Sequence, residues 1–366
     1  MCFVEGYVTI ISRLKKSHLA ELSSATSYLE KVQRSLLLVF RGSLIKKVFM
    51  GSEVNVKFWG VRGSIPTPLS AQQIQAKISA AIQRITPDDI KSSDSRERFI
   101  ASLPSWIFGT TGGNTPCVEL TSAANEKIIF DAGTGIRVMG KLGQPAENLH
   151  YNLFFSHFHW DHIQGLPFFD YIYNPSAKFD IYSPFEKMEE YLKKQMVAPY
   201  YPVDWSVVSK NMKFHILSDE SEQNFNGVSV SFVKMNHPGT SYSYAVCENG
   251  KKFVYGTDVE LLSSDFDTKN KALARVFENA DAVVIDSQYT VEEAMHKVNW
   301  GHSAFCYAVD FAVAWKIKNL YLYHHEPMYD DKKLNSILES ARWYSDYVSG
   351  GKIQIQLAYE GMEIQL

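Results

Sequence analysis

The stretch Ser156-His157-Phe158-His159-Trp160-Asp161-His162 gathers three imidazoles and a carboxylate within a few residues. Residues 149–155 before it are apolar and aromatic, which predicts a buried strand that ends at this stretch. Alternate side chains of an extended segment point to the same side, so His157 and His159 should lie together. Asp161 and His162 follow where the chain turns away. Because imidazole and carboxylate groups are ligands for zinc and its neighbours, the stretch predicts a loop that can bind two metals.

Four further predicted strands each end at or just before a histidine or an aspartate. The strands cover residues 228–235, 253–255, 282–285 and 320–323, and the residues that follow are His237, Asp258, Asp286, His324 and His325. Side chains at the strand ends of a rigid scaffold can gather from distant parts of a sequence. We therefore expect polar residues from these strand ends to join the first cluster.

With these motifs in this order, the chain resembles the metallo-β-lactamase superfamily over about residues 54–366. The resemblance implies an α/β (α+β) fold, a four-layer αββα sandwich in which two mixed β-sheets lie face to face with helices outside. Residues 54–68, 113–120 and 159–169 are similar to bacterial phosphodiesterase-like members. The expected activity is therefore that of a metal-dependent hydrolase.

The resemblance also implies a set of metal ligands. The first metal is expected to bind His157, His159 and His237, and the second to bind Asp161, His162 and His324, with Asp258 bridging the two. His324 is preferred because Pro327 follows it at the family's usual spacing, and His325 is the alternative. Two divalent ions are expected as cofactors, with zinc favoured and manganese or iron as alternatives. Asp131, in a glycine-rich turn, is expected to orient ligands without binding metal.

Two residues are candidates for catalysis, namely Asp161 and His302. Asp161 is placed to orient or deprotonate the attacking water. Apolar residues at helical spacing predict a buried helix from His302 to Ile317, with His302 in its first turn. Helix N-termini attract anions, so His302 could bind phosphate and protonate a leaving alkoxide. His302-Ser303 matches the proposed proton donor of the superfamily's phosphodiesterase branch, although a surface histidine with no role is the alternative.

These residues favour hydrolysis of a phosphodiester, with a small or cyclic nucleotide as the substrate. Two metals roughly 3.5–4 Å apart can hold a hydroxide between them and stabilise the displacement. A tRNA 3′-processing endoribonuclease is less favoured because it needs a basic surface for RNA. Residues 1–50 carry +5 from eight basic and three acidic residues, so the rest of the chain carries −8 of the total of −3. Lactone or thioester hydrolysis and an inert metal-binding sensor are further alternatives.

The sequence also predicts how the chain is organised. Residues 1–50 are expected to be a dispensable basic extension, with a membrane-surface helix or a docking arm as alternatives. Residues 51–366 are expected to form the hydrolase domain, with a helical insertion at about 70–110 that serves as a lid or as packing. Within it, Thr86-Pro87-Asp88-Asp89 is expected to cap a second helix. Aromatic residues in 168–173 and 200–205 are interpreted as packing, with stacking on a nucleobase as the alternative.

Composition limits the class of protein. Hydrophobic residues make up 45% and charged residues 21% of the 366 residues, which is typical of a globular protein. Apolar runs long enough to span a membrane are absent from the sequence, and its four cysteines are widely spaced. We therefore expect a cytoplasmic protein with reduced thiols and no membrane partner. A homodimer is compatible with the resemblance.

Overall fold

The computed structural model describes residues 53–218 and 222–366. The chain divides into two units, residues 1–52 and Glu53–Leu366, and all of the described residues belong to the second. The predicted basic extension at residues 1–50 lies outside the described residues. Among the described residues, none of the helices combines the length and the apolar character needed to cross a bilayer.

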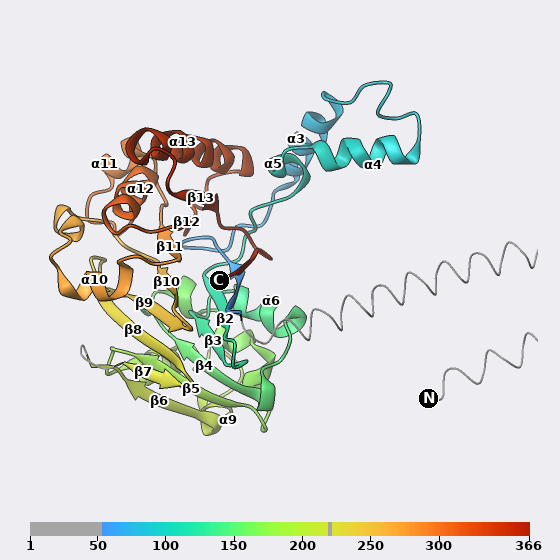
Figure 1. The fold of residues 1–366 in the computed structure, drawn as a ribbon. Helices are drawn as coiled ribbons and strands as arrows, with labels where there is room; N and C mark the ends of the chain where they lie inside the picture. Colours follow the sequence, from blue (N-terminus) through green and yellow to red (C-terminus); the bar gives the residue numbers. More distant parts are fainter. Residues whose placement is uncertain (1–52, 219–221) are drawn as a thin grey trace, which may run out of the picture. The chain divides into compact units, whose positions relative to one another are not determined.

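Two seven-stranded mixed sheets form the centre of the second unit (Figure 1). In the first sheet the order is β14-β1-β2-β3-β4-β5-β6, antiparallel from β14 to β3 and parallel from β3 to β6. Its strands are β1 (Asn55–Gly60), β2 (Cys117–Thr121), β3 (Lys127–Phe130), β4 (His150–Phe154), β5 (Lys178–Ser183), β6 (Met212–Ile216) and β14 (Glu363–Gln365).

In the second sheet the order is β13-β12-β11-β10-β9-β8-β7, parallel from β13 to β10 and antiparallel from β10 to β7. Its strands are β7 (Gln223–Phe225), β8 (Val228–Met235), β9 (Ser241–Glu248), β10 (Lys251–Gly256), β11 (Ala282–Asp286), β12 (Asn319–Tyr323) and β13 (Gln354–Leu357). Within the second sheet, the parallel strands β11 and β12 are nearly continuous apolar runs, as expected for strands covered on both faces.

The helices are α3 (Ala71–Ile82), α4 (Ser93–Ser102), α5 (Ser105–Phe108), α6 (Gly135–Leu142), α7 (Trp160–Ile163), α8 (Met188–Lys194), α9 (Trp205–Val208), α10 (Lys271–Phe277), α11 (Val291–His296), α12 (Phe305–Ala314) and α13 (Asp331–Ser349). Helices lie on the outer faces of both sheets, whereas α3 and α4 bury none of their residues and extend away from the sheets (Figure 1). On the first sheet α6 packs against β1 and β2, while on the second α12 packs against β11 and β12, and α13 against β13.

Three buried apolar clusters fill the spaces between these layers. One cluster, including Phe58, Phe130 and Tyr244, joins residues of both sheets. A second, including Ile136 and Leu192, lies between the first sheet and its helices, and a third lies between the second sheet and α10, α12 and α13. Three cores separate four layers, which confirms the predicted αββα sandwich of two mixed sheets flanked by helices.

The helices between β1 and β2 are α3, α4 and α5, in the region where a helical insertion was predicted. The predicted cap of the second helix is wrong, because α4 begins at Ser93 and is capped by Ser92. Thr86 instead closes a separate turn, in which its backbone N–H and its hydroxyl both donate to Asp89 Oδ2. A side chain that accepts from the backbone three residues away occurs in turns as well as in helix caps, so the motif does not distinguish them.

Candidate metal centre

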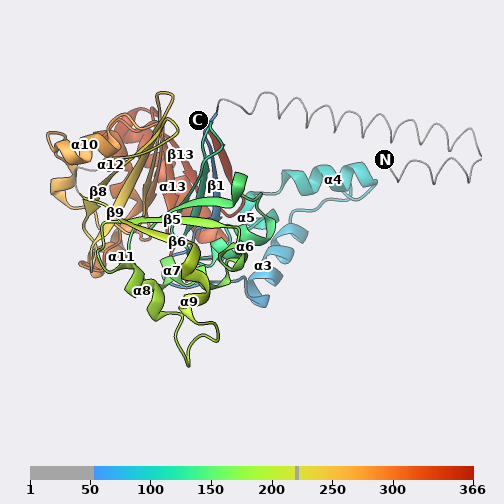
Figure 2. The same ribbon diagram turned by 90° about the horizontal axis from the view of Figure 1, so that it is seen from below.

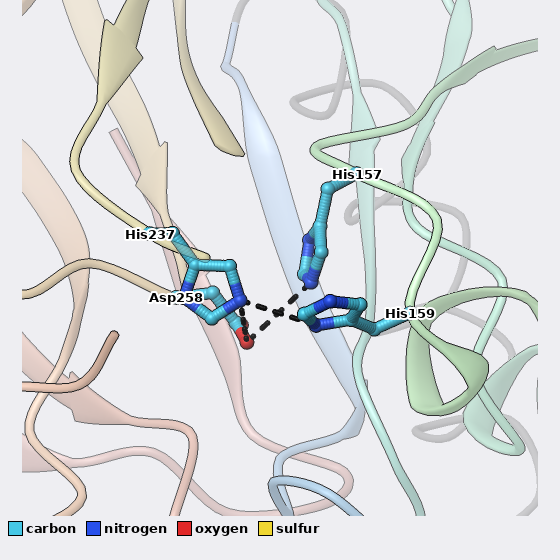
Figure 3. A group of neighbouring side chains, drawn as sticks. All are labelled: His157, His159, His237 and Asp258. Atoms are coloured by element: carbon cyan, nitrogen blue, oxygen red, sulfur yellow. Dashed lines mark hydrogen bonds and ion pairs between the residues drawn. The ribbon is translucent and has the colours of Figure 1, made fainter. Parts of the chain in front are cut away.

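The first group of metal-binding side chains converges from three separate strand ends (Figure 3). His157 and His159 follow β4, His237 follows β8 and Asp258 follows β10. Asp258 Oδ2 lies 3.7 Å from His157 Nε2 and 3.8 Å from His237 Nε2. His237 Nε2 lies 3.1 Å from His159 Nδ1. Three imidazoles and a carboxylate that point at one centre form a donor set suited to zinc.

The second group consists of Asp161, His162, Asp258 and His324, and all four are buried. Asp258 Oδ1 lies 3.1 Å from His162 Nε2 and 3.2 Å from His324 Nε2. Asp161 Oδ2 lies 3.2 Å from each of the same two nitrogens. One oxygen of Asp258 thus faces each group, which is the arrangement of a carboxylate that bridges two metals. All seven predicted ligands therefore lie in these two groups.

The rings are held by hydrogen bonds at the nitrogen that faces away from the centre. His162 Nδ1 pairs with Asp131 Oδ2 at 2.8 Å, His237 Nδ1 with the Gly301 carbonyl at 2.9 Å, and His324 Nδ1 with Gln288 Oε1 at 3.2 Å. A proton on Nδ1 leaves the Nε2 lone pair free for a metal.

Two buried nitrogen atoms without hydrogen-bond partners in the described part of the chain indicate that these side chains fit metal ions. Among the residues that the structure describes, the buried Nε2 atoms of His157 and His162 make no hydrogen bond. A buried polar atom without a hydrogen-bond partner is costly unless a ligand or ion satisfies it. Both atoms point into the groups just described, so the residues fit two divalent ions with nitrogen and oxygen ligands.

The surroundings of His157 and Asp258 favour the protonation states in which these two residues bind metals. Burial lowers the pKa of His157 well below its usual value, and the neighbouring His162 lowers it further. Burial opposes ionisation of Asp258, but His162 and His324 hold the pKa of this carboxyl well below its usual value. Neutral imidazole and ionised carboxylate are the forms that bind metal.

Asp131 braces the loop that carries the first ligands. Its carboxylate accepts hydrogen bonds from the backbone N–H of Ser156 (2.8 Å), the Ser156 hydroxyl (2.7 Å) and the Tyr255 hydroxyl (2.8 Å), in addition to His162. It is not a member of either ligand group. These contacts are those of a residue that orients ligands, as the sequence predicted for it.

His302 lies beside the centre but not in a helix. The predicted start of its helix is wrong, because α12 begins at Phe305 and its cap is Ala304. The His302 ring stacks on that of His324 with a centroid separation of 4.9 Å and lies 5.4 Å from that of His237. The loop places His302 at the edge of the metal centre without any help from a helix N-terminus.

Asp286 is the partner that holds His302. Its Oδ2 lies 2.6 Å from His302 Nδ1, and its Oδ1 accepts a hydrogen bond from the Ser303 backbone N–H. Burial alone would lower the pKa of His302, but the Asp286 carboxylate raises it to about 9. Asp286 was identified in the sequence only as a strand end, and its pairing with His302 was missed.

Other contributions to the site gave no signal in the sequence. Gln288 orients His324, and the Ser64 backbone N–H donates to Asp161 Oδ2 at 2.7 Å. Gly301 has a φ of 88°, and a Cβ atom there would lie 2.2 Å from His237 Nδ1. Only glycine adopts this conformation readily and also leaves room for that ring.

The two adjacent histidines after β12 have different surroundings. The ring of His324 lies in the second group, whereas His325 Nε2 is 2.8 Å from the carbonyl of Ala358. Burial, with Arg62 nearby, lowers the pKa of His325 to about 3. The structure thus places the preferred residue, and not its alternative, at the second group.

Comparison with known proteins is consistent with this geometry. Residues 126–325, more than half of the chain, match the family model described as Beta-lactamase superfamily domain. Ribonuclease Z from Picrophilus torridus is 24% identical over 298 residues, which cover 66% of this chain and 92% of that protein. Ribonuclease Z from Clostridium perfringens is 23% identical over 281 residues, which cover 61% of this chain and 89% of that protein.

Solved structures show the same fold. The metallo-beta-lactamase fold protein YhfI from Bacillus subtilis has a TM-score of 0.57 at 16% identity, covering 86% of this chain and 100% of that one. Unliganded yeast PDE1 has a TM-score of 0.57 at 14% identity, with coverage of 86% and 100%. With the family model, the sandwich and the clustered histidines and aspartates in agreement, this chain belongs to the metallo-β-lactamase superfamily of metal-dependent hydrolases.

Proposed function

We propose that this protein hydrolyses small phosphodiesters, with cyclic or other small nucleotides as the substrates, at a centre of two divalent metals. The observation that carries the proposal is the position of Asp258, which offers one oxygen to each ligand group. The pair His302–Asp286 lies directly beside this centre and supplies an acid. A shared carboxylate and an adjacent acid are the groups that displacement at phosphorus requires.

When bound, two divalent ions would activate water and neutralise charge on the phosphoryl oxygens. The remaining steps belong to side chains of this chain. Asp161, fixed by the Ser64 backbone N–H, can orient the attacking water and accept its proton. Because His302 Nδ1 is held by Asp286, its Nε2 is the atom that can donate a proton to the leaving oxygen. The negative charge of Asp286 stabilises the protonated form of that ring.

A tRNA 3′-processing endoribonuclease is the second candidate. Two relatives described as ribonuclease Z favour it, because this chain matches each of them over most of that relative's length. The charge of −8 outside residues 1–50 opposes it, because binding of a long polyanion depends on many Lys and Arg contacts to phosphates. The small substrate therefore remains the first choice.

The test is hydrolysis of bis(p-nitrophenyl) phosphate by protein of measured metal content. A panel of cyclic nucleotides and a tRNA precursor with a 3′ extension would be assayed in parallel. Asp258→Ala removes the bridging carboxylate, and Asp88→Ala, an exposed carboxylate of the 71–108 region, is the matched control. We expect activity that requires two metals per chain and disappears only in Asp258→Ala. Absence of phosphodiester turnover at full metal occupancy would contradict the proposal, and turnover of the tRNA precursor alone would favour the second candidate.

A further inference from the structure

A cavity of about 870 Å³ adjoins the first ligand group. Its lining includes His157 and His159, together with Pro238, Gly239 and Thr240, which follow His237 in the chain. The cavity therefore continues directly from the metal centre. Its volume is within the range of pockets that bind small molecules, roughly 300–1,000 Å³, and is ample for a nucleoside.

Aromatic side chains form much of the cavity wall, and they come from α7, α8 and the segments around them, which lie near one another in Figure 2. The inner part of this wall is already packed, since Phe158 meets Tyr191 and Phe185 at ring-centroid distances of 5.3 and 5.4 Å. The outer part of the wall is more exposed, although Phe168 meets Tyr201 at a ring-centroid distance of 5.7 Å. Trp160 is 78% exposed, Tyr200 82% and Phe168 53%. Large rings this exposed beside a cavity can gain from contact with a planar apolar ligand.

Polar groups in the same cavity indicate what kind of ligand would fit. Gln164, Lys194, Gln195 and Thr240 contribute to the lining. A hydrocarbon chain would leave such groups unsatisfied, whereas a heteroaromatic ring offers both a face for stacking and an edge with hydrogen-bond acceptors. These two features together favour a nucleobase over an acyl chain.

We propose that this cavity binds the base of a nucleotide, stacked against Trp160 and Tyr200, while the phosphate lies at the metal centre. This inference rests on the proposed function in that it names the substrate class of the same site. It assigns Trp160, in the middle of the first metal motif, to recognition of the base. One short segment thus supplies ligands on one side and a stacking surface on the other.

The test compares the binding of AMP and of ribose 5-phosphate to the metal-loaded protein by calorimetry. Both ligands carry the same phosphate and sugar and differ only in the base. Stacking of one base contributes about 1–3 kcal/mol, so AMP should bind the wild type at least about 5-fold more tightly. Trp160→Ala and Tyr200→Ala should remove most of this preference. Trp343→Ala, which changes a tryptophan of α13 that is 70% exposed, should keep it.

The outcome can be separated from that of the proposed function, because neither ligand is a diester and no turnover is needed. A preference for AMP that Trp160→Ala abolishes supports the cavity as a base site even if diester hydrolysis fails. Equal preference in wild type and Trp160→Ala, or no preference in either, overturns the inference even if diesters are hydrolysed. Thermal unfolding of each variant verifies that the exposed substitutions leave the fold intact.

Discussion

Replacing Gly63 with alanine should remove one metal from the centre without unfolding the protein. A Cβ atom at Gly63 would lie 2.6 Å from both Cε1 and Nδ1 of His324. Non-bonded carbon atoms pack at about 3.5–4.0 Å, so the ring would have to retreat by roughly 1 Å. Gly63 is not among the glycines with positive φ, so its backbone conformation is open to alanine. The effect should therefore act through the His324 ring.

The size of the effect follows from coordination geometry. A zinc–nitrogen bond is about 2.0–2.1 Å, and a ring displaced by roughly 1 Å cannot keep it. The second group would then hold its metal with three ligands where four were available. We expect the metal content to fall from two ions per chain to one. Because misplacement of about 1 Å in a catalytic constellation can cost about 100-fold, phosphodiester turnover should fall by at least that factor.

Metal analysis, turnover and thermal unfolding are measured on the same preparations. Gly109→Ala is the matched control, because a Cβ atom there would meet one carbonyl oxygen, that of Ser105, at 3.3 Å. Gly63→Ala with two metals and normal turnover would show that His324 does not bind metal from this position. Equal loss of metal in both variants would show that the effect is general instability.

Three further outcomes follow from the structure. Asp286→Asn should retain both metals but lower turnover of a cyclic nucleotide by about 100-fold, since general acid catalysis typically contributes 10²–10⁴-fold. Turnover of bis(p-nitrophenyl) phosphate, whose leaving group needs no proton, should fall much less. Equal losses on both substrates would contradict the assignment of His302 as the acid. Chelation should lower the melting temperature, since an ion at 100 times its Kd stabilises the folded state by about 2.7 kcal/mol, and added zinc should restore it; an unchanged melting temperature would argue against bound metal. Away from the centre, burial opposes ionisation of Asp180, but hydrogen bonds from His150 and His215, each at 2.6 Å, lower the pKa of Asp180 below its usual value. A lowered carboxyl pKa stabilises the fold above the unfolded pKa of about 3.9 and loses that contribution as the pH falls through the folded pKa. The stability difference between wild type and Asp180→Asn should thus be present at pH 5 and shrink below about pH 4, and a difference that grows on acidification would refute the reasoning.

The strands could be predicted from the sequence because the pattern of apolar and polar residues along a segment indicates which of its side chains are buried. The predicted strand at residues 228–235 has the bounds found in the structure. The seven predicted ligands lie together because each follows a strand of one of two facing sheets, directly or, for Asp161 and His162, in the short helix α7 after β4, and the ends of these strands meet at the same edge. Strand periodicity predicted that residues at these strand ends would cluster, and the resemblance to the superfamily supplied their assignment to two metals.

Apart from the local turn at Thr86, the parts that failed depend on contacts between distant segments. The spacing of apolar residues predicted the buried face of α12 but not its first residue, because His302 is held outside the helix by Asp286 at the end of β11. The hydrogen bond between His324 Nδ1 and the Gln288 side-chain oxygen and the fit of Gly301 against His237 likewise join residues far apart in the chain. Periodicity within one segment carries no information about such pairs. The wall of the cavity beside the metal centre could not be predicted for the same reason, since its aromatic rings come from several segments.

The backbone at the centre gives an independent reason to regard these side chains as functional. Asp131, Asp258 and His324 follow β3, β10 and β12, and their φ values are 58°, 48° and 58°. A residue with a Cβ atom pays about 1 kcal/mol or more in this left-handed region, where glycine would be relaxed. All three side chains converge on one site, and two of them are candidate ligands. The fold therefore keeps a strained conformation at three strand ends, which is understandable if a carboxylate or an imidazole is needed at each of them.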